Sequence, residues 1–267
     1  MKYILMCAAA LIVCLVCAWV PALLIGKKKG LKRPVTVLIG FGLTLLLAVI
    51  VMACYLGVYY HADESAAVKS DAVRMENIDG GYFFDGPGKE AALIFYPGAK
   101  VETLAYAPLM TALAERGVDC FLADMPFRMA IFGSDIAEKF QSAYSYKTWA
   151  AAGHSMGGLV ISSYAADHAD SIDSLILLAA YPGKTIPDSV ETLSIYGSLD
   201  GCLNRDVYET SREYWPTTAS EYVLPGGNHA NYGNYGMQDG DMEAEITREA
   251  QQTFTAEKIL ELVDHCK

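Results

Sequence analysis

The pattern of apolar and polar residues divides the chain into two parts near residue 60. Two long stretches, at about residues 3–25 and 35–60, contain no charged residue. A helix needs about 20 apolar residues to cross the core of a bilayer, so both stretches are long enough. A cleaved signal peptide fits the first stretch less well, because its apolar region is shorter and a second span follows here. The pattern therefore predicts a transmembrane hairpin over residues 1–60.

Beyond residue 60, short apolar segments alternate with amphipathic ones. Residues 61–77 are polar and are expected to form a linker, so that one folded domain occupies residues 78–267. Strands are predicted at residues 80–86, 91–98, 118–127, 148–155, 172–183, 190–201 and 220–229. Helices are predicted at residues 106–117, 157–170, 205–215 and 247–265. Strands that are apolar on both faces and alternate with helices indicate a doubly wound α/β fold, with a mostly parallel sheet covered on both sides.

Charge is distributed as unevenly as hydrophobicity. Residues 1–60 carry six of the 20 basic side chains and none of the 31 acidic ones, which leaves 14 basic and 31 acidic side chains, a net charge of −17, in the remainder. A domain of this charge has no electrostatic reason to bind nucleic acid. Five of the six positive charges lie at residues 27–33, between the two predicted spans. Short basic loops stay in the cytoplasm, so we expect a two-span protein of the cell membrane, held in the lipid bilayer by residues 1–60, with its domain outside the cytoplasm.

Cysteine usage indicates neither a metal site nor a disulfide framework. Of the seven cysteines, Cys120, Cys202 and Cys266 lie outside the predicted spans, and their odd number and spacing match no framework. The only CxxC motif, Cys14–Cys17, lies inside the first predicted span, and the sequence contains no HExxH motif, so no metal and no cofactor is predicted. The acidic run at residues 238–245 has the composition of a calcium loop, but such runs are more often simply solvated.

Three residues suited to hydrolytic chemistry follow predicted strands. Ser155 stands in the motif Gly-His-Ser-Met-Gly between a strand and a helix, and Asp200 and His229 follow two later strands. Ligand sites in such sheets lie at the carboxyl ends of the strands, so the three side chains are expected at one edge. Asp188 and Asp206 are alternatives to Asp200. A turn serine, a helix-capping aspartate and a packed loop histidine are the structural alternatives to a catalytic group.

The motifs around these residues resemble those of the α/β-hydrolase family. Gly-His-Ser-Met-Gly-Gly is similar to the family's nucleophile elbow, Tyr-Gly-Ser-Leu-Asp-Gly to its acid loop, and Gly-Gly-Asn-His-Ala-Asn-Tyr-Gly to its histidine loop. The resemblance covers about residues 80–266, and the compact length without a cap resembles the lidless, dienelactone-hydrolase-like branch. In one departure, Pro97-Gly98 stands where the family usually has His-Gly in its oxyanion loop.

The resemblance implies a role for each residue. Ser155 is the expected nucleophile, His229 its general base, and Asp200 the carboxylate that holds the histidine ring in the right tautomer. The backbone N–H groups of Met156 and Ala99 are expected to form the oxyanion hole.

Further residues near these motifs are candidates for substrate binding. Tyr232 and Tyr235 follow His229 and either line a pocket or pack, and Lys100 follows the expected oxyanion loop. His154 is adjacent to Ser155, and we interpret it as a packing residue because its side chain points away from its neighbour's.

Together these features predict a membrane-anchored serine hydrolase that cleaves a small or short-acyl ester or lactone through an acyl-enzyme. The lack of a lid favours a shallow pocket formed by loops. The alternatives are a peptidase or transacylase that uses the same three residues, and a catalytically silent binding domain that has kept the fold.

Overall fold

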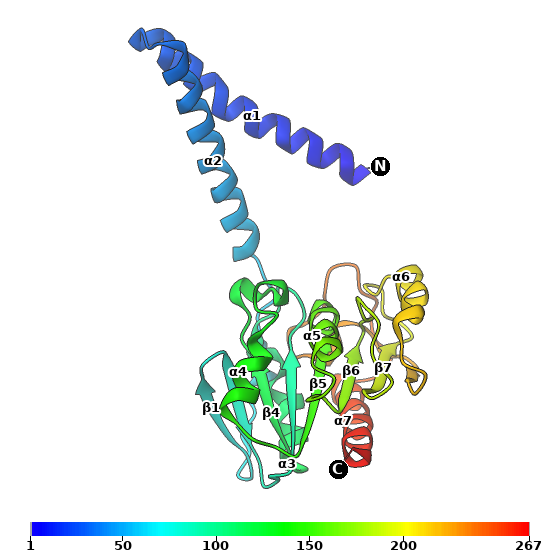
Figure 1. The fold of residues 1–267 in the computed structure, drawn as a ribbon. Coiled ribbons are helices and arrows are strands. Elements are labelled where there is room, and N and C mark those ends of the chain that lie inside the picture. Colours follow the sequence, from blue (N-terminus) through cyan, green and yellow to red (C-terminus); the bar gives the residue numbers. More distant parts are fainter. Residues whose placement is uncertain (1, 267) are drawn as a thin grey trace. The chain divides into compact units, whose positions relative to one another are not determined.

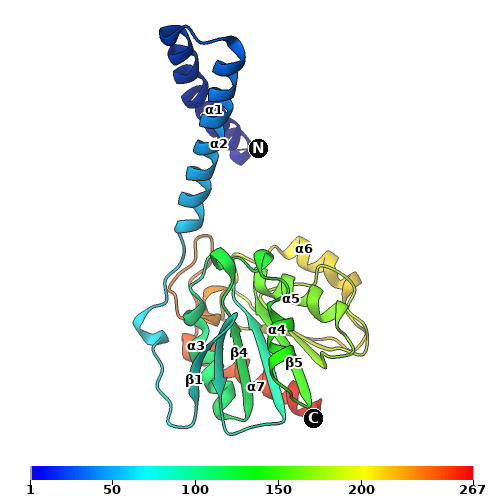
Figure 2. The same ribbon diagram turned by 60° about the vertical axis from the view of Figure 1, so that its left-hand side comes forward.

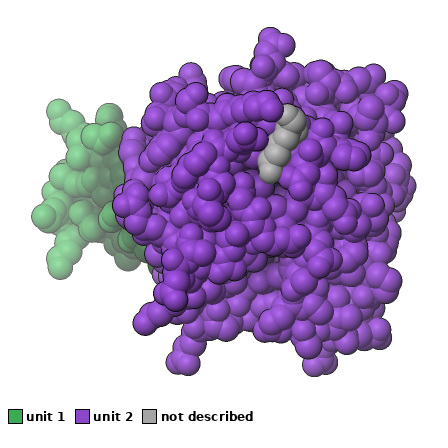
Figure 3. Space-filling model, turned by 90° about the horizontal axis from the view of Figure 1, so that it is seen from below, with its two compact units in different colours: residues 1–58 green, residues 59–267 purple. Residues whose placement is uncertain are grey.

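The computed structural model describes residues 2–266, with side chains from residue 13 onward. The chain forms two compact units, Met1–Val58 and Tyr59–Lys267 (Figure 3).

The first unit consists of two helices, α1 (Lys2–Lys29) and α2 (Arg33–Gly57). Within the part of the chain whose side chains are described, α2 is the one helix long and apolar enough to cross a membrane. The span predicted at residues 3–25 falls on α1, but part of it lies outside the described side chains. The helices pack closely at Gly40, where a Cβ atom would lie 2.9 Å from the indole of Trp19.

The second unit is built on an eight-stranded sheet in the order β1-β2-β4-β3-β5-β6-β7-β8. The strands are β1 (Arg74–Ile78), β2 (Gly81–Asp85), β3 (Ala91–Tyr96), β4 (Val118–Ala123), β5 (Thr148–His154), β6 (Ser174–Leu178), β7 (Glu191–Gly197) and β8 (Ser220–Leu224). Strand β2 runs antiparallel to both of its neighbours, whereas β3 to β8 are parallel. The mostly parallel sheet that the sequence predicts is confirmed.

Helices cover both faces of this sheet (Figures 1 and 2). The helices are α3 (Ala107–Glu115), α4 (Ile136–Ala143), α5 (Met156–Asp167), α6 (Arg205–Thr210) and α7 (Arg248–His265). The short 3-10 helices are η1 (Glu64–Ala66), η2 (Thr103–Tyr106), η3 (Pro126–Arg128), η4 (Ala130–Phe132), η5 (Ser211–Tyr214) and η6 (Ala230–Tyr232). Successive side chains of a strand point to opposite faces, so Leu93 of β3 packs with α3 and α7, and Ile94 packs with α4 and α5. These helices therefore bury the apolar side chains on the two faces of the sheet in two hydrophobic clusters.

The structure differs from the sequence prediction at the start of the domain. Helix α2 ends at Gly57, and Tyr60 forms a parallel bridge with Val101. Residues 61–77, expected as a linker, lie within the second unit, where Asp63 N–H donates to the Asn234 carbonyl. Polar composition suggested a free segment there, but its polar groups are satisfied by contacts with residues distant in sequence. Strand β1, which falls in this segment, pairs with β2 and forms the edge of the sheet.

Candidate active site

Ser155 occupies a strained turn between β5 and α5. Its φ and ψ angles are 53° and −123°, a combination that costs a residue with a side chain about 1–3 kcal/mol. The turn is held by a hydrogen bond from Ser155 N–H to the Leu178 carbonyl, 2.9 Å long. It also requires glycine at position 157, since a Cβ atom there would lie 2.1 Å from the Tyr96 carbonyl oxygen. The Ser155 residue at this turn is partly exposed.

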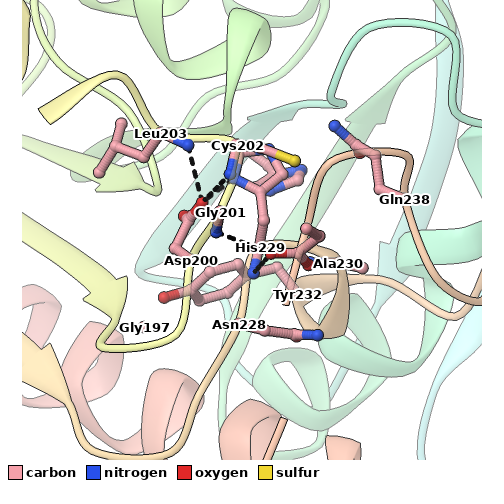
Figure 4. A network of polar contacts seen from close by, with 12 residues as sticks. Gly197, Asp200, Gly201, Cys202, Leu203, Asn228, His229, Ala230, Tyr232 and Gln238 are labelled. Carbon is pink, nitrogen blue, oxygen red and sulfur yellow. Dashed lines mark hydrogen bonds and ion pairs between the residues drawn. The ribbon is translucent and has the colours of Figure 1, made fainter. Parts of the chain in front are cut away.

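Asp200 and His229 form a buried pair at the ends of β7 and β8. Asp200 Oδ2 lies 2.9 Å from His229 Nδ1, and both side chains are almost fully buried (Figure 4). The other carboxylate oxygen, Oδ1, accepts hydrogen bonds from the N–H groups of Cys202 and Leu203, at 2.9 and 2.8 Å. A carboxylate only accepts hydrogen bonds, so His229 carries its proton on Nδ1. Nε2 is then free to accept a proton, and among the described residues it has no hydrogen-bond partner.

A cavity of about 230 Å³ brings these elements together. Ser155, Met156 and Leu159 line it from the start of α5, and His229 lines it from the loop after β8. Its lining also includes Cys202, whose pKa is raised to about 11, chiefly by burial and then by Asp241 and Asp200. At neutral pH this thiol is protonated and a poor nucleophile.

Of the two N–H groups expected to form an oxyanion hole, the structure brings one to the cavity. Met156 lines it at the first residue of α5, where backbone N–H groups have no partner within the helix. Ala99 is half-buried and is not among the residues described as lining the cavity. It lies between Gly98, whose N–H donates to the Tyr106 hydroxyl at 3.1 Å, and Lys100, whose N–H donates to the Arg128 carbonyl at 2.8 Å.

The three candidates for substrate binding lie elsewhere. Tyr232 is fully buried, with its hydroxyl donating to the Ile195 carbonyl at 3.2 Å, and Tyr235 is 6% exposed in the same core. Neither tyrosine is described among the cavity residues, nor is Lys100. Of the two interpretations of the tyrosines, the structure supports packing, because the loop after His229 turns back into the core.

The alternative aspartates are engaged elsewhere or exposed. Asp188 accepts hydrogen bonds from the N–H and hydroxyl groups of Thr217, and Asp206 is exposed in the first turn of α6. Within the described residues, no group of three or more His, Cys, Asp or Glu side chains is arranged to hold a metal ion.

A second histidine packs against the ring of His229. His154 is fully buried, its ring centroid is 4.5 Å from that of His229, and its Nδ1 is 2.7 Å from the Tyr106 hydroxyl. Burial, and secondarily the neighbouring His229, lower the pKa of His154 well below its usual value, so its ring stays neutral. Burial raises the pKa of Tyr106, which keeps its hydroxyl protonated. The same hydroxyl accepts a hydrogen bond from Gly98 N–H, so Tyr106 connects His154 to the loop after β3.

Asp241 connects the two loops that carry Asp200 and His229. In the sequence, nothing except its acidic surroundings marks this role. One carboxylate oxygen accepts from the N–H groups of Gly201 and His229, at 3.0 and 3.2 Å, and the other from Ala230 N–H, at 2.9 Å. Hydrogen bonds to a charged group are about twice as strong as neutral ones. The carboxylate is therefore occupied in fixing the separation of the two loops.

We expect Asp241→Ala to lower kcat about tenfold or more with little change in KM, because the Asp200–His229 geometry loses its brace. Three N–H groups also lose a charged acceptor, which is expected to reduce the free energy of unfolding by about 2 kcal/mol. Steady-state kinetics and thermal denaturation measure both effects. Asp239→Ala is the matched control, since this exposed carboxylate lies in the same loop. Equal kinetics for the two variants would show that the brace is dispensable.

The sheet order and a site at the carboxyl edge of its parallel strands define an α/β hydrolase fold, and by class the protein is a hydrolase. The sequence profile described as "Alpha/beta hydrolase family" matches residues 92–253, more than half of the chain, and the chain belongs to this family. No curated protein matches the sequence.

Several solved structures share the fold at low sequence identity. Est1E from Butyrivibrio proteoclasticus is 17% identical, with a TM-score of 0.51, over 73% of this chain and 100% of that one. A dienelactone hydrolase from Anabaena variabilis is 14% identical, with a TM-score of 0.51, over 71% and 98%. A bacterial membrane phospholipase A is 14% identical, with a TM-score of 0.54, over 85% and 97%.

Proposed function

We propose that the protein is a serine hydrolase that cleaves carboxylic esters through an acyl-enzyme, with Ser155, His229 and Asp200 as its catalytic triad. The observation that carries this proposal is the Asp200–His229 hydrogen bond, which leaves Nε2 of a buried ring without a partner at the cavity that Ser155 lines. A buried nitrogen without a hydrogen-bond partner destabilises the fold, so a donor is expected to face it. The Ser155 hydroxyl is the proton source in the same cavity.

Each step of the reaction follows from these positions. His229 Nε2 takes the Ser155 proton as Oγ attacks the ester carbonyl, and Asp200 stabilises the resulting imidazolium. The N–H of Met156, at the start of α5, stabilises the negative oxygen of the tetrahedral intermediate. His229 then returns the proton to the leaving alcohol. Water repeats the sequence on the acyl-enzyme and releases the acid.

We further propose that residues 1–60 anchor the enzyme in a membrane, with the body outside the cytoplasm. The length and composition of α2 support the anchor. The basic residues at the end of α1, at the start of α2 and in the turn between them support the orientation. Among the structural neighbours, one is named a membrane phospholipase A and another a dienelactone hydrolase, and both names describe ester or lactone chemistry.

A membrane-impermeant fluorophosphonate tests the mechanism and the orientation together. It is expected to label the protein on intact cells, because an activated serine reacts with it and a silent binding domain does not. Labelling only after the membrane is opened would place the active site inside the cytoplasm. No labelling in either condition would contradict the proposed nucleophile. Purified protein is expected to hydrolyse p-nitrophenyl acetate and butyrate much faster than aminoacyl p-nitroanilides, and the reverse preference would indicate a peptidase.

A further inference from the structure

Three exposed apolar side chains lie together on the segment after β4. Phe127, Ile131 and Phe132 are 60%, 53% and 54% exposed, and the two phenyl rings meet edge to face at 5.8 Å. Both Phe127 and Arg128 have positive φ angles, 54° and 57°, which non-glycine residues adopt only at a cost. The backbone is thus held in an unfavourable conformation that leaves a large apolar ring in water. The segment lies beyond the carboxyl ends of the strands, the edge that carries Ser155 (Figure 1).

Two more exposed apolar side chains lie on the loop before α7. Met237 and Met242 are each 51% exposed. Between them, Asp239 N–H donates to the Tyr60 hydroxyl at 3.0 Å. We call these five side chains the apolar rim: Phe127, Ile131, Phe132, Met237 and Met242.

Tyr59 and Tyr60 contact the two segments that carry the apolar rim. The Arg128 guanidinium stacks on the Tyr59 ring, 3.4 Å from its centroid, and Tyr60 holds the loop of Met237 and Met242 through its hydroxyl. In the sequence, only Val58 separates Tyr59 from Gly57, the last residue of α2. A helix that crosses a bilayer places the residues immediately after it at the bilayer surface, where tyrosine is enriched. Covalent connection therefore keeps the rim within reach of the surface.

Residues that line the Ser155 cavity also adjoin the two segments that carry the rim. Leu159 lines this cavity and also a second hollow whose lining includes Ile131. Cys202 lines the cavity toward the second loop, where its thiol contacts the Asp239 carbonyl at 3.7 Å. At about 230 Å³ the cavity is smaller than the pockets that enclose whole drug-sized ligands. It has room for an ester group and a short part of a chain.

We propose that the apolar rim inserts into the surface of the bilayer that holds α2, and that the Ser155 cavity takes its substrate from there, as the acyl ester of a membrane lipid. The proposal rests on the proposed function, since it needs both the anchor and the serine chemistry. The cavity encloses the scissile ester while the rest of the acyl chain stays in the lipid. Hydrolysis consumes one water, breaks the ester C–O bond and releases the fatty acid and the lipid alcohol. The net charge of the body is strongly negative, so apolar insertion and not charge attraction holds this face.

Fluorescence tests the position of the rim. The full-length protein with Phe132→Trp is reconstituted in phosphatidylcholine vesicles, with and without bromine on the acyl chains. Bromine is expected to quench the added tryptophan beyond the quenching of the native ones. Tyr222→Trp, on the edge strand β8, is the control and is expected to add an unquenched signal. If bromine quenches the added tryptophan equally in the two variants, the proposal is wrong. A rim that packs against a second copy of the chain, and not in the bilayer, would give this result.

Activity tests the substrate class. Phe127→Ser/Phe132→Ser is compared with Met75→Ser/Val223→Ser, which removes two apolar side chains of similar exposure, 51% and 47%, from β1 and β8. Both variants are expected to hydrolyse water-soluble p-nitrophenyl butyrate at the wild-type rate. With a fluorogenic long-acyl glycerol ester in phosphatidylcholine vesicles, the rim variant is expected to lose about tenfold or more in rate, since each inserted ring contributes about a factor of ten in partitioning. The control variant is expected to keep its rate.

The outcomes separate the two proposals. If the wild type hydrolyses neither ester, the proposed function fails. If it hydrolyses the soluble ester but not the lipid ester, or if the rim and control variants lose the lipid activity equally, the serine hydrolase stands and the lipid face is wrong.

Discussion

Replacing Ser155 by alanine is expected to abolish ester hydrolysis and to leave the fold intact. In a triad the nucleophile and base act as a unit, and loss of the serine lowers kcat roughly a million-fold. Among the described residues, no side-chain hydrogen bond of Ser155 supports the fold, since the turn is held by its backbone N–H. Alanine has the same steric restriction at a φ of 53°, so the strain is unchanged and the thermal midpoint is expected to stay within a few degrees.

Turnover of p-nitrophenyl butyrate and circular dichroism during heating measure these two quantities. Ser162→Ala is a useful control, because Ser162 is a buried serine of the same helix whose hydroxyl donates to the Leu159 carbonyl. Its loss is expected to change stability and to leave the chemistry in place. Residual turnover of a tenth of wild type in Ser155→Ala would contradict the mechanism, because no other group in the cavity is an activated nucleophile.

Asp200→Asn is expected to lower kcat about ten-thousand-fold, and the structure gives a specific reason. The N–H groups of Cys202 and Leu203 both point at Oδ1, so the amide oxygen of asparagine will take that place. The amide NH₂ then faces His229 Nδ1 at the position that Oδ2 occupied. Nδ1 must become the acceptor and Nε2 must carry the proton. The histidine is thereby held in the tautomer that cannot accept the proton of Ser155.

The pH profile and two further variants complete this test. In Asp200→Asn, kcat is expected to recover partly at high pH, where hydroxide substitutes for the lost base. Asp188→Asn and Asp206→Asn are expected to keep wild-type kcat, because the first is bound to Thr217 and the second is exposed on α6. If Asp188→Asn were inactive and Asp200→Asn were active, the assignment of the acid would be wrong.

The alternation of apolar segments was sufficient to predict the fold. Strands buried on both faces, such as Ala91–Tyr96 and Thr148–His154, have continuous apolar sequences that only a parallel sheet between helices accommodates. The same reasoning placed Ser155, Asp200 and His229 at one edge, because chain order and strand direction determine which residues leave the sheet on that side. The sequence did not predict α4 or the 3-10 helices around it, since these short elements depend on what they pack against.

The sequence alone determined the class of sheet, the strained turn at Ser155 and the edge at which a site forms, because these depend on local periodicity and on glycine at fixed positions. Tertiary structure decided what depends on contacts between distant residues. It placed Asp200 and not its rivals against His229, buried Tyr232 and Tyr235 in the core, and made Asp241 a brace between two loops. The periodicity of the sequence does not show which backbone N–H groups a carboxylate will accept hydrogen bonds from. Those groups come close only after the sheet has brought the loops together.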